Sequence, residues 1–432
     1  MKSYKPFLIL FLLLSITLQM TAQENAVKRD TLQVSLDSAE SAFLQKNLLL
    51  LAQKYNIDAQ KALIIQAKLW PNPNFSYARG VVVPINDKAS GTNATFFNNS
   101  ENAASLSQLI LLAGKRNKQI KIAEANAKLA EYQFYDLLRT LKYTLRSDFF
   151  NIYYMQESAK VYEKEIKALQ QIVDAYASQQ GKGYISEKDV VRIKAQLYSF
   201  QSEYNDLINQ INDTESELRL VLQEKATVYI DPQPNLSAIS SLDPGKYSLN
   251  LLVDSAYKNR TDLSIARANN DIGKLNYSYQ KALAVPDLTV SLAYDQKGSY
   301  VQNFNSAGVS MDLPFFNRNQ GNIKSAKAII AVNEATQSSV QATVEENVTR
   351  SLEKAFAQDK LYKKVDPHFE KDFDRLTGEV IKNYQIRNIS LLDFLDFYDS
   401  YKQNVLQINN IKYNRIQALE DLNFYTGTNF FY

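Results

Sequence analysis

Two aspartates near the C-terminus, Asp393 and Asp396, are three residues apart in a segment whose pattern predicts a helix. Side chains at that spacing share one face of a helix, so the two carboxylates lie close together. Neighbouring carboxylates attract cations and disfavour anions. The pair therefore indicates a cation-selective feature, with an ordinary acidic first helical turn that faces solvent as the alternative.

Few other side chains could do chemistry. The chain contains no cysteine, which excludes disulfides, thiolate metal ligands and a lipid attached to an N-terminal cysteine. Its one histidine, His368, follows Pro367, and no nucleophile–base pair or cluster of metal ligands stands out in the sequence. We interpret His368 as structural or exposed. We expect no catalytic residue, no metal site and no cofactor, so an enzyme is a poorly supported class.

The chain consists of two related halves. Residues 107–120 have a counterpart in residues 310–323, and both segments lead into a helical pattern. Ile185-Ser186, followed by Asp189, returns as Ile389-Ser390, followed by Asp393. A period near 200 residues is too long for a solenoid unit, which has about 20–50 residues. The pattern therefore indicates that one half-molecule was duplicated.

The N-terminus has the three parts of a secretory signal in residues 1–23. An apolar core at 7–14 follows Lys2 and Lys5, and residues 21–23 form a plausible cleavage zone. This core is shorter than the ~20 residues that cross a membrane as a helix; a retained anchor is the alternative. The chain has 49 basic residues, including both signal lysines, against 46 acidic ones. That near-neutral balance predicts no nucleic-acid partner.

Each half has the pattern of a helix, a β-hairpin and a long helical hairpin. In the first repeat, 24–230, a helix at 36–69 ends before two prolines, and the β-hairpin follows at about 73–112. The helical hairpin comprises residues 115–224. Its first helix runs for 66 residues without glycine or proline. Apolar side chains along it alternate between steps of three and four, as in a coiled coil.

The second repeat follows a linker. Residues 231–248 contain several prolines and serines and predict an irregular connection. The second repeat comprises residues 249–432, with its β-hairpin at about 287–315 and its helical hairpin at 320–425. Pro367 and Gly378 interrupt the long helix of this copy, which we therefore expect to be kinked or broken near them.

Alternating residues predict the strands. In 305–315 one face is apolar and the other is small or polar; the apolar residues are Ala307, Val309, Met311, Leu313 and Phe315. Such strands are typical of tilted transmembrane β-strands, and a small soluble hairpin packed on helices is the equal alternative. Trp70, Phe75 and Tyr77 are candidate membrane-interface anchors, or they pack against the hairpin. Two hairpins give four strands, too few to close a membrane barrel, so several copies would have to share one.

Over nearly the whole mature chain, these segments resemble the TolC-type outer-membrane efflux proteins. Leu313–Gly321 is similar to the strand-to-helix signature of the heavy-metal (CzcC-like) branch, and residues 69–73, 114–116 and 388–396 match other family segments. The resemblance implies a mainly α fold with a small β part. In that fold, a homotrimer forms a 12-stranded outer-membrane β-barrel that a periplasmic α-helical barrel continues. The chain departs from many relatives because it lacks their lipidated N-terminal cysteine.

The resemblance also implies where partners bind. The two helical turns, at the end farthest from the strands, match the tip where a periplasmic adaptor docks. The residues of these turns are Gly183, Tyr184, Ile185 and Ser186 in the first repeat and Arg387, Asn388, Ile389 and Ser390 in the second. Plain turns with helix caps are the alternative.

The same resemblance assigns a gate. Asp393 and Asp396 match a gating ring, while Asp189 and Tyr384 match positions whose hydrogen bonds help to hold the tip shut. A solvated acid and an aromatic residue of the helical seam would explain Asp189 and Tyr384 equally well. In the first repeat, Arg192 stands where Asp396 predicts a second acid.

The function that follows is a passive exit duct in the outer membrane, extending into the periplasm. It would conduct substrate that an inner-membrane pump exports through the periplasmic adaptor, and we expect this pump to be of the resistance-nodulation-division type. Heavy-metal cations are one candidate cargo. An outer-membrane channel for drugs or for type I protein secretion is the alternative, and a periplasmic coiled-coil structural or adaptor protein is a further one.

Overall fold

The computed structural model describes residues 30–80, 101–182, 185–298, 300–386 and 388–431. The expected signal at 1–23 lies outside the described residues, as do Gly183, Tyr184 and Arg387 of the two helical turns. Within the described residues the fold is mainly helical with a small β part, which confirms the expected class.

The helices of the first repeat are α2 (Leu36–Lys46), α3 (Leu48–Lys68), α4 (Lys115–Gln180) and α5 (Glu187–Leu222). Helix α4 is the 66-residue segment without glycine or proline. The expected single helix at 36–69 is two helices, because Asn47 is extended and its side chain donates a hydrogen bond to the Val221 carbonyl at 2.9 Å.

The second repeat has α7 (Leu249–Asn259), α8 (Thr261–Leu283), α9 (Gln320–Tyr362), α10 (Phe369–Gln385) and α11 (Leu391–Thr426). Arg260 separates α7 from α8 with an extended backbone, as Asn47 separates α2 from α3. The expected interruption of the long helix falls at 363–368, which includes Pro367. Gly378 lies inside α10 and does not interrupt it.

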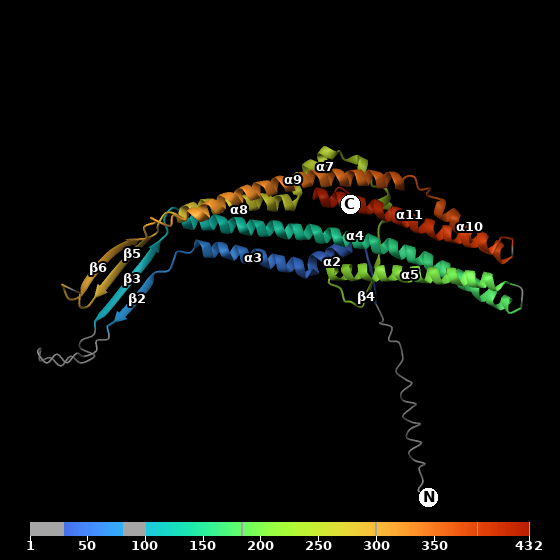
Figure 1. Cartoon of the computed structure of the whole chain (residues 1–432), viewed down its shortest axis with the longest axis horizontal. Coiled ribbons are helices and arrows are strands. Elements are labelled where there is room, and N and C mark those ends of the chain that lie inside the picture. The colour runs from blue at the N-terminus through green and yellow to red at the C-terminus, as the bar shows by residue number, and fades with distance from the viewer. Residues whose placement is uncertain (1–29, 81–100, 183–184, 299, 387, 432) are drawn as a thin grey trace, which may run out of the picture. The chain divides into compact units, whose positions relative to one another are not determined.

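The hairpins of the two repeats join in one antiparallel sheet. Its strands are β2 (Asn74–Arg79), β3 (Asn102–Ile110), β5 (Leu288–Asp295) and β6 (Phe304–Met311), and their order is β2-β3-β5-β6 (Figure 1). The contact between the repeats is the β3–β5 pair, which runs from Ala103 opposite Asp295 to Ile110 opposite Leu288.

A second, parallel pair was not predicted. It joins β1 (Asp30–Val34) to β4 (Val228–Pro232). The segment expected as a linker, 231–248, therefore begins inside a strand, and it also contains the short helix α6 (Leu236–Ser240) and a 3₁₀ turn at Pro244–Lys246. Each of these strands has only five residues, and β4 ends in proline, so the pattern is too short to be found by alternation.

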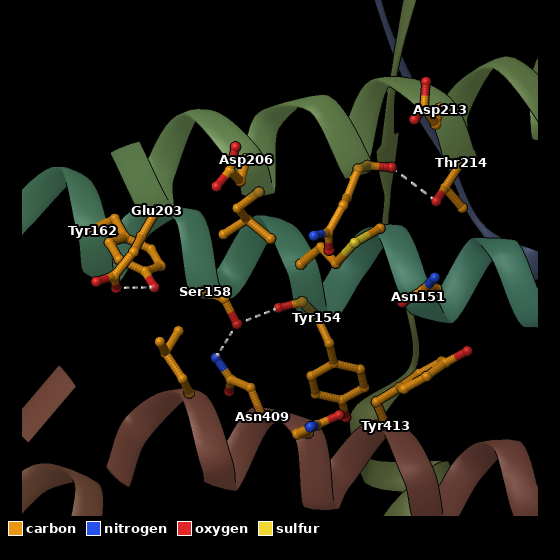
Figure 2. Close-up of a pocket in the computed structure, with 15 residues that line it drawn as sticks. Asn151, Tyr154, Ser158, Tyr162, Glu203, Asp206, Asp213, Thr214, Asn409 and Tyr413 are labelled. Carbon is orange, nitrogen blue, oxygen red and sulfur yellow. Dashed lines mark hydrogen bonds between the residues drawn. The ribbon is translucent and has the colours of Figure 1, made fainter. Parts of the chain in front are cut away.

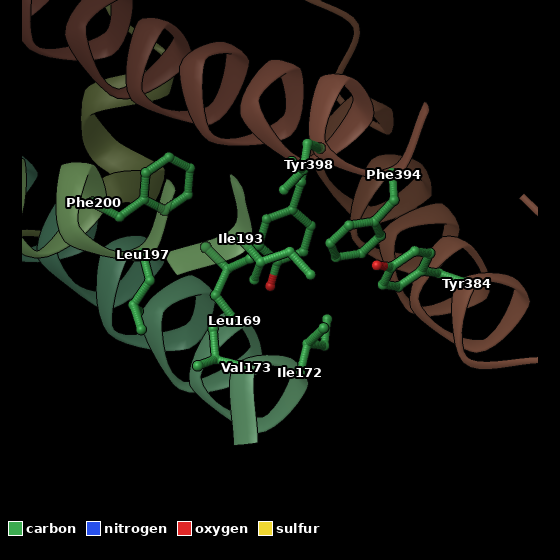
Figure 3. Close-up of a cluster of buried hydrophobic side chains, with 10 residues drawn as sticks. Leu169, Ile172, Val173, Ile193, Leu197, Phe200, Tyr384, Phe394 and Tyr398 are labelled. Carbon is green, nitrogen blue, oxygen red and sulfur yellow. The ribbon is translucent and has the colours of Figure 1, made fainter. Parts of the chain in front are cut away.

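The chain divides into two compact units, and each contains parts of both repeats. One unit comprises residues up to 47, 142–242 and 358–417, and the other comprises 48–141, 243–357 and 418–432. The first unit therefore holds the helical turns and the hydrophobic cluster around Leu169 and Phe394 (Figure 3). The second holds the four-stranded sheet.

Candidate functional site

The two helical turns are capped by the same side-chain geometry. Ser186 accepts a hydrogen bond from the Asp189 backbone N–H at 3.2 Å, and its hydroxyl donates to Asp189 Oδ2 at 2.7 Å. Ser390 and Asp393 repeat this arrangement with the same two distances. The serine satisfies a free N–H at the start of each helix, and the acid at the third position complements the helix dipole. The two turns therefore share the same capping hydrogen bonds, as the predicted duplication leads us to expect.

The acidic pair lies at the surface of α11. Asp393 and Asp396 are both exposed and are three residues apart on that helix, so they share a face as expected. One Asp393 oxygen accepts the Ser390 hydroxyl hydrogen bond, whereas Asp396 lies one turn further along the helix. Asp393 therefore accepts a side-chain hydrogen bond that Asp396 does not share among the described residues.

The described docking candidates lie at or near the surface. Ser186, Asn388 and Ser390 are exposed. Ile185 and Ile389 are half-buried, and Ile389 packs against the hydrophobic cluster. The Asn388 backbone N–H donates to the Asn383 carbonyl at 2.8 Å and closes the second turn. Each turn therefore combines exposed polar groups with one isoleucine that is only partly covered.

Asp189 and Tyr384 are not joined by a hydrogen bond in the described residues. Tyr384 is 3% exposed, and its ring stacks on Phe394 with centroids 4.3 Å apart. Burial raises the pKa of the Tyr384 hydroxyl, with Tyr176 and the Asp189 charge adding to the effect. The carboxylate of Asp189 is instead engaged by Ser186. Tyr384 acts here as a packing residue.

Sequence reasoning missed a column of aromatic rings in the buried cluster of the first unit (Figure 3). The column starts at Tyr384 on α10, continues through Phe394 and Tyr398 on α11, and reaches Phe200 on α5. Its successive ring centroids are 4.3, 5.0 and 6.5 Å apart. The column connects the α10–α11 pair to α5, and Leu169, Ile172 and Val173 of α4 pack against it. The spacing of four between Phe394 and Tyr398 was the available signal.

A buried lysine lies next to this column. Lys402 on α11 is 4% exposed, and its Nζ lies 4.1 Å from the centroid of the Phe200 ring. The same Nζ is 2.7 Å from Glu203 Oε2 and 3.2 Å from Asp399 Oδ1. Burial opposes ionisation of Glu203, but hydrogen bonds from Lys402 and Tyr162 outweigh it and lower the pKa of that carboxyl. The result is an ion pair between α5 and α11.

A polar hollow of about 680 Å³ lies between α4, α5 and α11 (Figure 2). Across it, Asn409 donates to the Ser158 hydroxyl at 3.1 Å and Tyr162 donates to Glu203 at 3.0 Å. Asp206 and Asp213 also line it, and both are exposed. Among the described residues, no group of three or more histidine or acidic side chains is placed to hold a metal ion. The hollow is therefore a polar surface groove between helices.

The sheet has two chemically different faces. The strand register places Phe75, Leu106, Leu292 and Ala307 in one row across all four strands. Phe75 is 69% exposed and Val309, on the same face, is also 69% exposed. On the opposite face the two central rows are small and polar: Ser76-Ser105-Ala293-Ser306 and Asn74-Ser107-Ser291-Gly308. One face of the sheet is therefore apolar, and none of the residues that the structure describes covers it.

An ion pair between buried Lys115 and partly exposed Asp287 links the sheet to the helices. Lys115 Nζ lies 2.6 Å from Asp287 Oδ1 and donates to the Val285 carbonyl at 2.7 Å. The Leu112 backbone N–H donates to the same Asp287 oxygen at 2.9 Å. These contacts join the strand-to-helix turn of the first repeat to the helix-to-strand turn of the second.

The three proposed interface anchors are all exposed and lie at or next to β2. Trp70, Phe75 and Tyr77 are 61%, 69% and 60% exposed. The Arg116 guanidinium lies 4.4 Å from the Trp70 ring centroid and donates to the Lys68 carbonyl, which holds the ring in place. The Tyr77 hydroxyl donates to Asn102 at 2.7 Å. These rings remain available to an external apolar medium.

In the part of the chain that the structure describes, no helix is both long enough and apolar enough to cross a membrane.

Comparison with known proteins gives consistent matches. The model of the outer membrane efflux protein family matches residues 40–223. A curated relative, the cobalt-zinc-cadmium resistance protein CzcC of Cupriavidus metallidurans, is 24% identical over 293 residues. The match covers 68% of this chain and 66% of that relative, just under two thirds of its length.

Solved structures share the fold. The CmeC outer membrane channel of Campylobacter jejuni has a TM-score of 0.72 at 15% identity, and the match covers 91% of this chain and 86% of that one. CusC also gives a TM-score of 0.72 at 15% identity, with 95% and 96% covered. The open MtrE channel of Neisseria gonorrhoeae gives 0.67 at 16% identity, with 91% and 89% covered.

Proposed function

We propose that this chain, which belongs to the TolC-type outer membrane efflux proteins, is the outer-membrane exit duct of a tripartite efflux system. The observation that carries the proposal is the four-stranded sheet, whose uncovered apolar face suits lipid and whose opposite face of small polar residues suits a watery lumen. The duct is passive, extends into the periplasm and performs no chemistry of its own.

The proposed assembly is a homotrimer. Four strands leave two open sheet edges, which lipid does not tolerate. Three copies supply twelve strands, enough for a barrel with a lumen. The helices that follow the strands form the periplasmic part of the duct. The partners are a periplasmic adaptor and an inner-membrane pump, of the resistance-nodulation-division type.

The proposed cargo is a heavy-metal cation. The support is the CzcC relative, whose name refers to resistance to cobalt, zinc and cadmium. The structurally similar channels do not indicate the cargo, because at 15% and 16% sequence identity they show only that the fold is shared. Drug export is the second candidate.

The proposed adaptor-docking surface is formed by the two helical turns. Their matching caps present Ile185 and Ile389 in the same local setting, so that one partner could bind both turns of the duplicated chain. Exposed polar groups around a partly covered isoleucine suit a helical partner that brings its own apolar residue.

The experiment compares cells that lack the protein with cells that express it or the Ile185→Asp/Ile389→Asp double variant. The wild type should restore export of zinc, cobalt or cadmium, measured as lower metal accumulation. The double variant should still assemble in the outer membrane but restore no export. Docking of the adaptor would bury the charge of each new aspartate, and this burial opposes docking. Tyr198→Asp, on an exposed side chain of α5, is the matched control and should behave as wild type. Undiminished export in the double variant removes these turns from the docking surface.

A further inference from the structure

Glu165, on α4, is a buried acid that the proposed duct does not use. Its side chain is 0% exposed, and neither carboxylate oxygen has a hydrogen-bond partner. It lies beside the aromatic column, where the Tyr398 hydroxyl donates to the Glu165 backbone carbonyl at 3.4 Å. A carboxylate without hydrogen bonds in such a place is strongly disfavoured relative to the neutral acid.

The charged groups around Glu165 do not neutralise it. On its own helix, Lys164 is paired with Asp374 of α10. On α11, Lys402 is paired with Glu203 of α5 and with Asp399. Both cations that act on Glu165 are therefore already engaged, and Asp374 disfavours its ionisation further.

The titratable neighbours of Glu165 act in opposite directions, and burial decides the outcome. Burial is the largest effect and raises the pKa of Glu165 to about 7, against a lowering contribution from Tyr398 and the two lysines. Burial and the nearby acids Asp374 and Glu165 likewise raise the pKa of Tyr401, so that tyrosine stays neutral. Glu165 is thus the group in this cluster that changes charge near neutral pH.

We propose that Glu165 is a proton-operated latch. With its carboxyl protonated, α4 packs against α10 and α11 as in the structure. Loss of the proton places an unpaired charge beneath Tyr398, weakens this packing and favours separation of α10 and α11 from α4 and α5. The proton-dependent packing is a property of a single chain. Its role in opening and closing the duct rests on the proposed function.

The direction with pH follows from proton linkage. An acid whose pKa is higher in the packed state than in the open state binds its proton more tightly when packed. The packing is therefore strongest at low pH, weakens as the pH rises from the ordinary glutamate value of 4.5 to about 7, and is constant above that. Between pH 5 and pH 8 the packing equilibrium should shift by on the order of 100-fold.

The test is hydrogen–deuterium exchange of the purified full-length protein in detergent at pH 5, 6, 7 and 8, corrected for the intrinsic exchange rate. Peptides from residues 369–398 should lose protection as the pH rises, by on the order of 100-fold in the wild type. Glu165→Gln should remove this pH response while keeping the side-chain shape. Glu165→Leu should remove it too, which guards against a folding defect in either variant alone.

Glu163→Gln is the matched control, because Glu163 is two residues away on the same helix, is exposed and accepts the Tyr204 hydroxyl hydrogen bond. It should keep the wild-type response. Exchange has to be measured at residues 369–398, because α4 contains a second buried acid, Asp148. Burial and the charge of Glu217 raise the pKa of Asp148 to about 7. A response that persists in both Glu165 variants, or a wild type without one, overturns the latch.

Conductance in planar bilayers separates the latch from the proposed function. If the protein forms pores, wild-type conductance should rise with pH and that of Glu165→Gln should not. Pores whose conductance is equally pH-dependent in both proteins overturn the role of the latch in gating. The absence of pores in every variant would count against the duct and leave the exchange result to decide the latch.

Discussion

The Asp393 carboxylate accepts a hydrogen bond from Ser390 and lies on the same exposed helix face as Asp396. The hydrogen bond with the capping serine uses part of the hydrogen-bonding capacity of Asp393, and the helix dipole offsets part of its charge. Asp396 has no such role among the described contacts. At the scale of single residues, the two acids of the proposed gating ring are therefore not equivalent.

Replacement of each acid by asparagine should show the difference. In the proposed trimer, Asp396→Asn should weaken the block of single-channel current by trivalent cations more than Asp393→Asn does, and the double variant should weaken it most. The physical reason is that removing carboxylates removes the field that holds the blocking cation. Bilayer recordings give the measurement. Glu187→Gln, in the exposed first turn of α5, is the control, and an unchanged block in the double variant argues against an acidic ring.

The aromatic column joins the two helical pairs of the first unit. It combines Tyr384 and Phe394 from the second repeat with Phe200 from the first, through Tyr398. Stacked and edge-on aromatic pairs add stabilisation beyond the area that they bury. At the scale of elements, the column determines how firmly α10 and α11 are held.

Truncation of the central ring tests this. Phe394→Ala should lower the free energy of unfolding by about 3–5 kcal/mol, because it removes a fully buried ring and leaves a cavity. Chemical denaturation followed by circular dichroism gives the measurement. Tyr198→Ala, which truncates a 62% exposed ring on α5, should change stability by no more than about 0.5 kcal/mol. Equal losses in the two variants would contradict a special role for the column.

The elements show what the sequence could and could not predict. The absence of glycine and proline predicted α4 to its full length, and Pro367 predicted the interruption before α10. The breaks at Asn47 and Arg260 were missed, because neither residue is a helix breaker and a tertiary contact, such as that of Asn47 with Val221, stabilises the extended backbone. The aromatic column was missed for a related reason: its rings are up to 198 positions apart, so only the folded chain brings them together.

At the scale of the whole molecule, the two faces of the sheet determine which side of it can meet lipid. Val309 lies on its uncovered apolar face and Ser306 on the opposite face, both in β6. If the apolar face meets lipid, Val309→Arg should cost about 2–4 kcal/mol near the middle of the bilayer and reduce the amount of assembled protein.

Ser306→Arg is the matched variant, because it places the same charge in the same strand on the opposite face. It should assemble normally and reduce cation conductance, since its charge points to the proposed lumen. Heat-resistant oligomer on gels and bilayer conductance give the two measurements. Equal assembly of both variants would contradict the assignment of the faces to lipid and lumen.

The pairing of β3 with β5 has a consequence for biogenesis. Because β3 and β5 form backbone hydrogen bonds with each other in the middle of the sheet, the edges of the described sheet are β2 and β6, one from each repeat. A newly made subunit therefore carries two unlike, unpaired edges in the described sheet, and in the proposed trimer β6 would pair with the β2 of another copy. Open edges of this kind are templates for aggregation. We therefore expect oligomerisation to follow secretion closely. A chaperone that covers one of the two edges would be sufficient to prevent edge-to-edge aggregation.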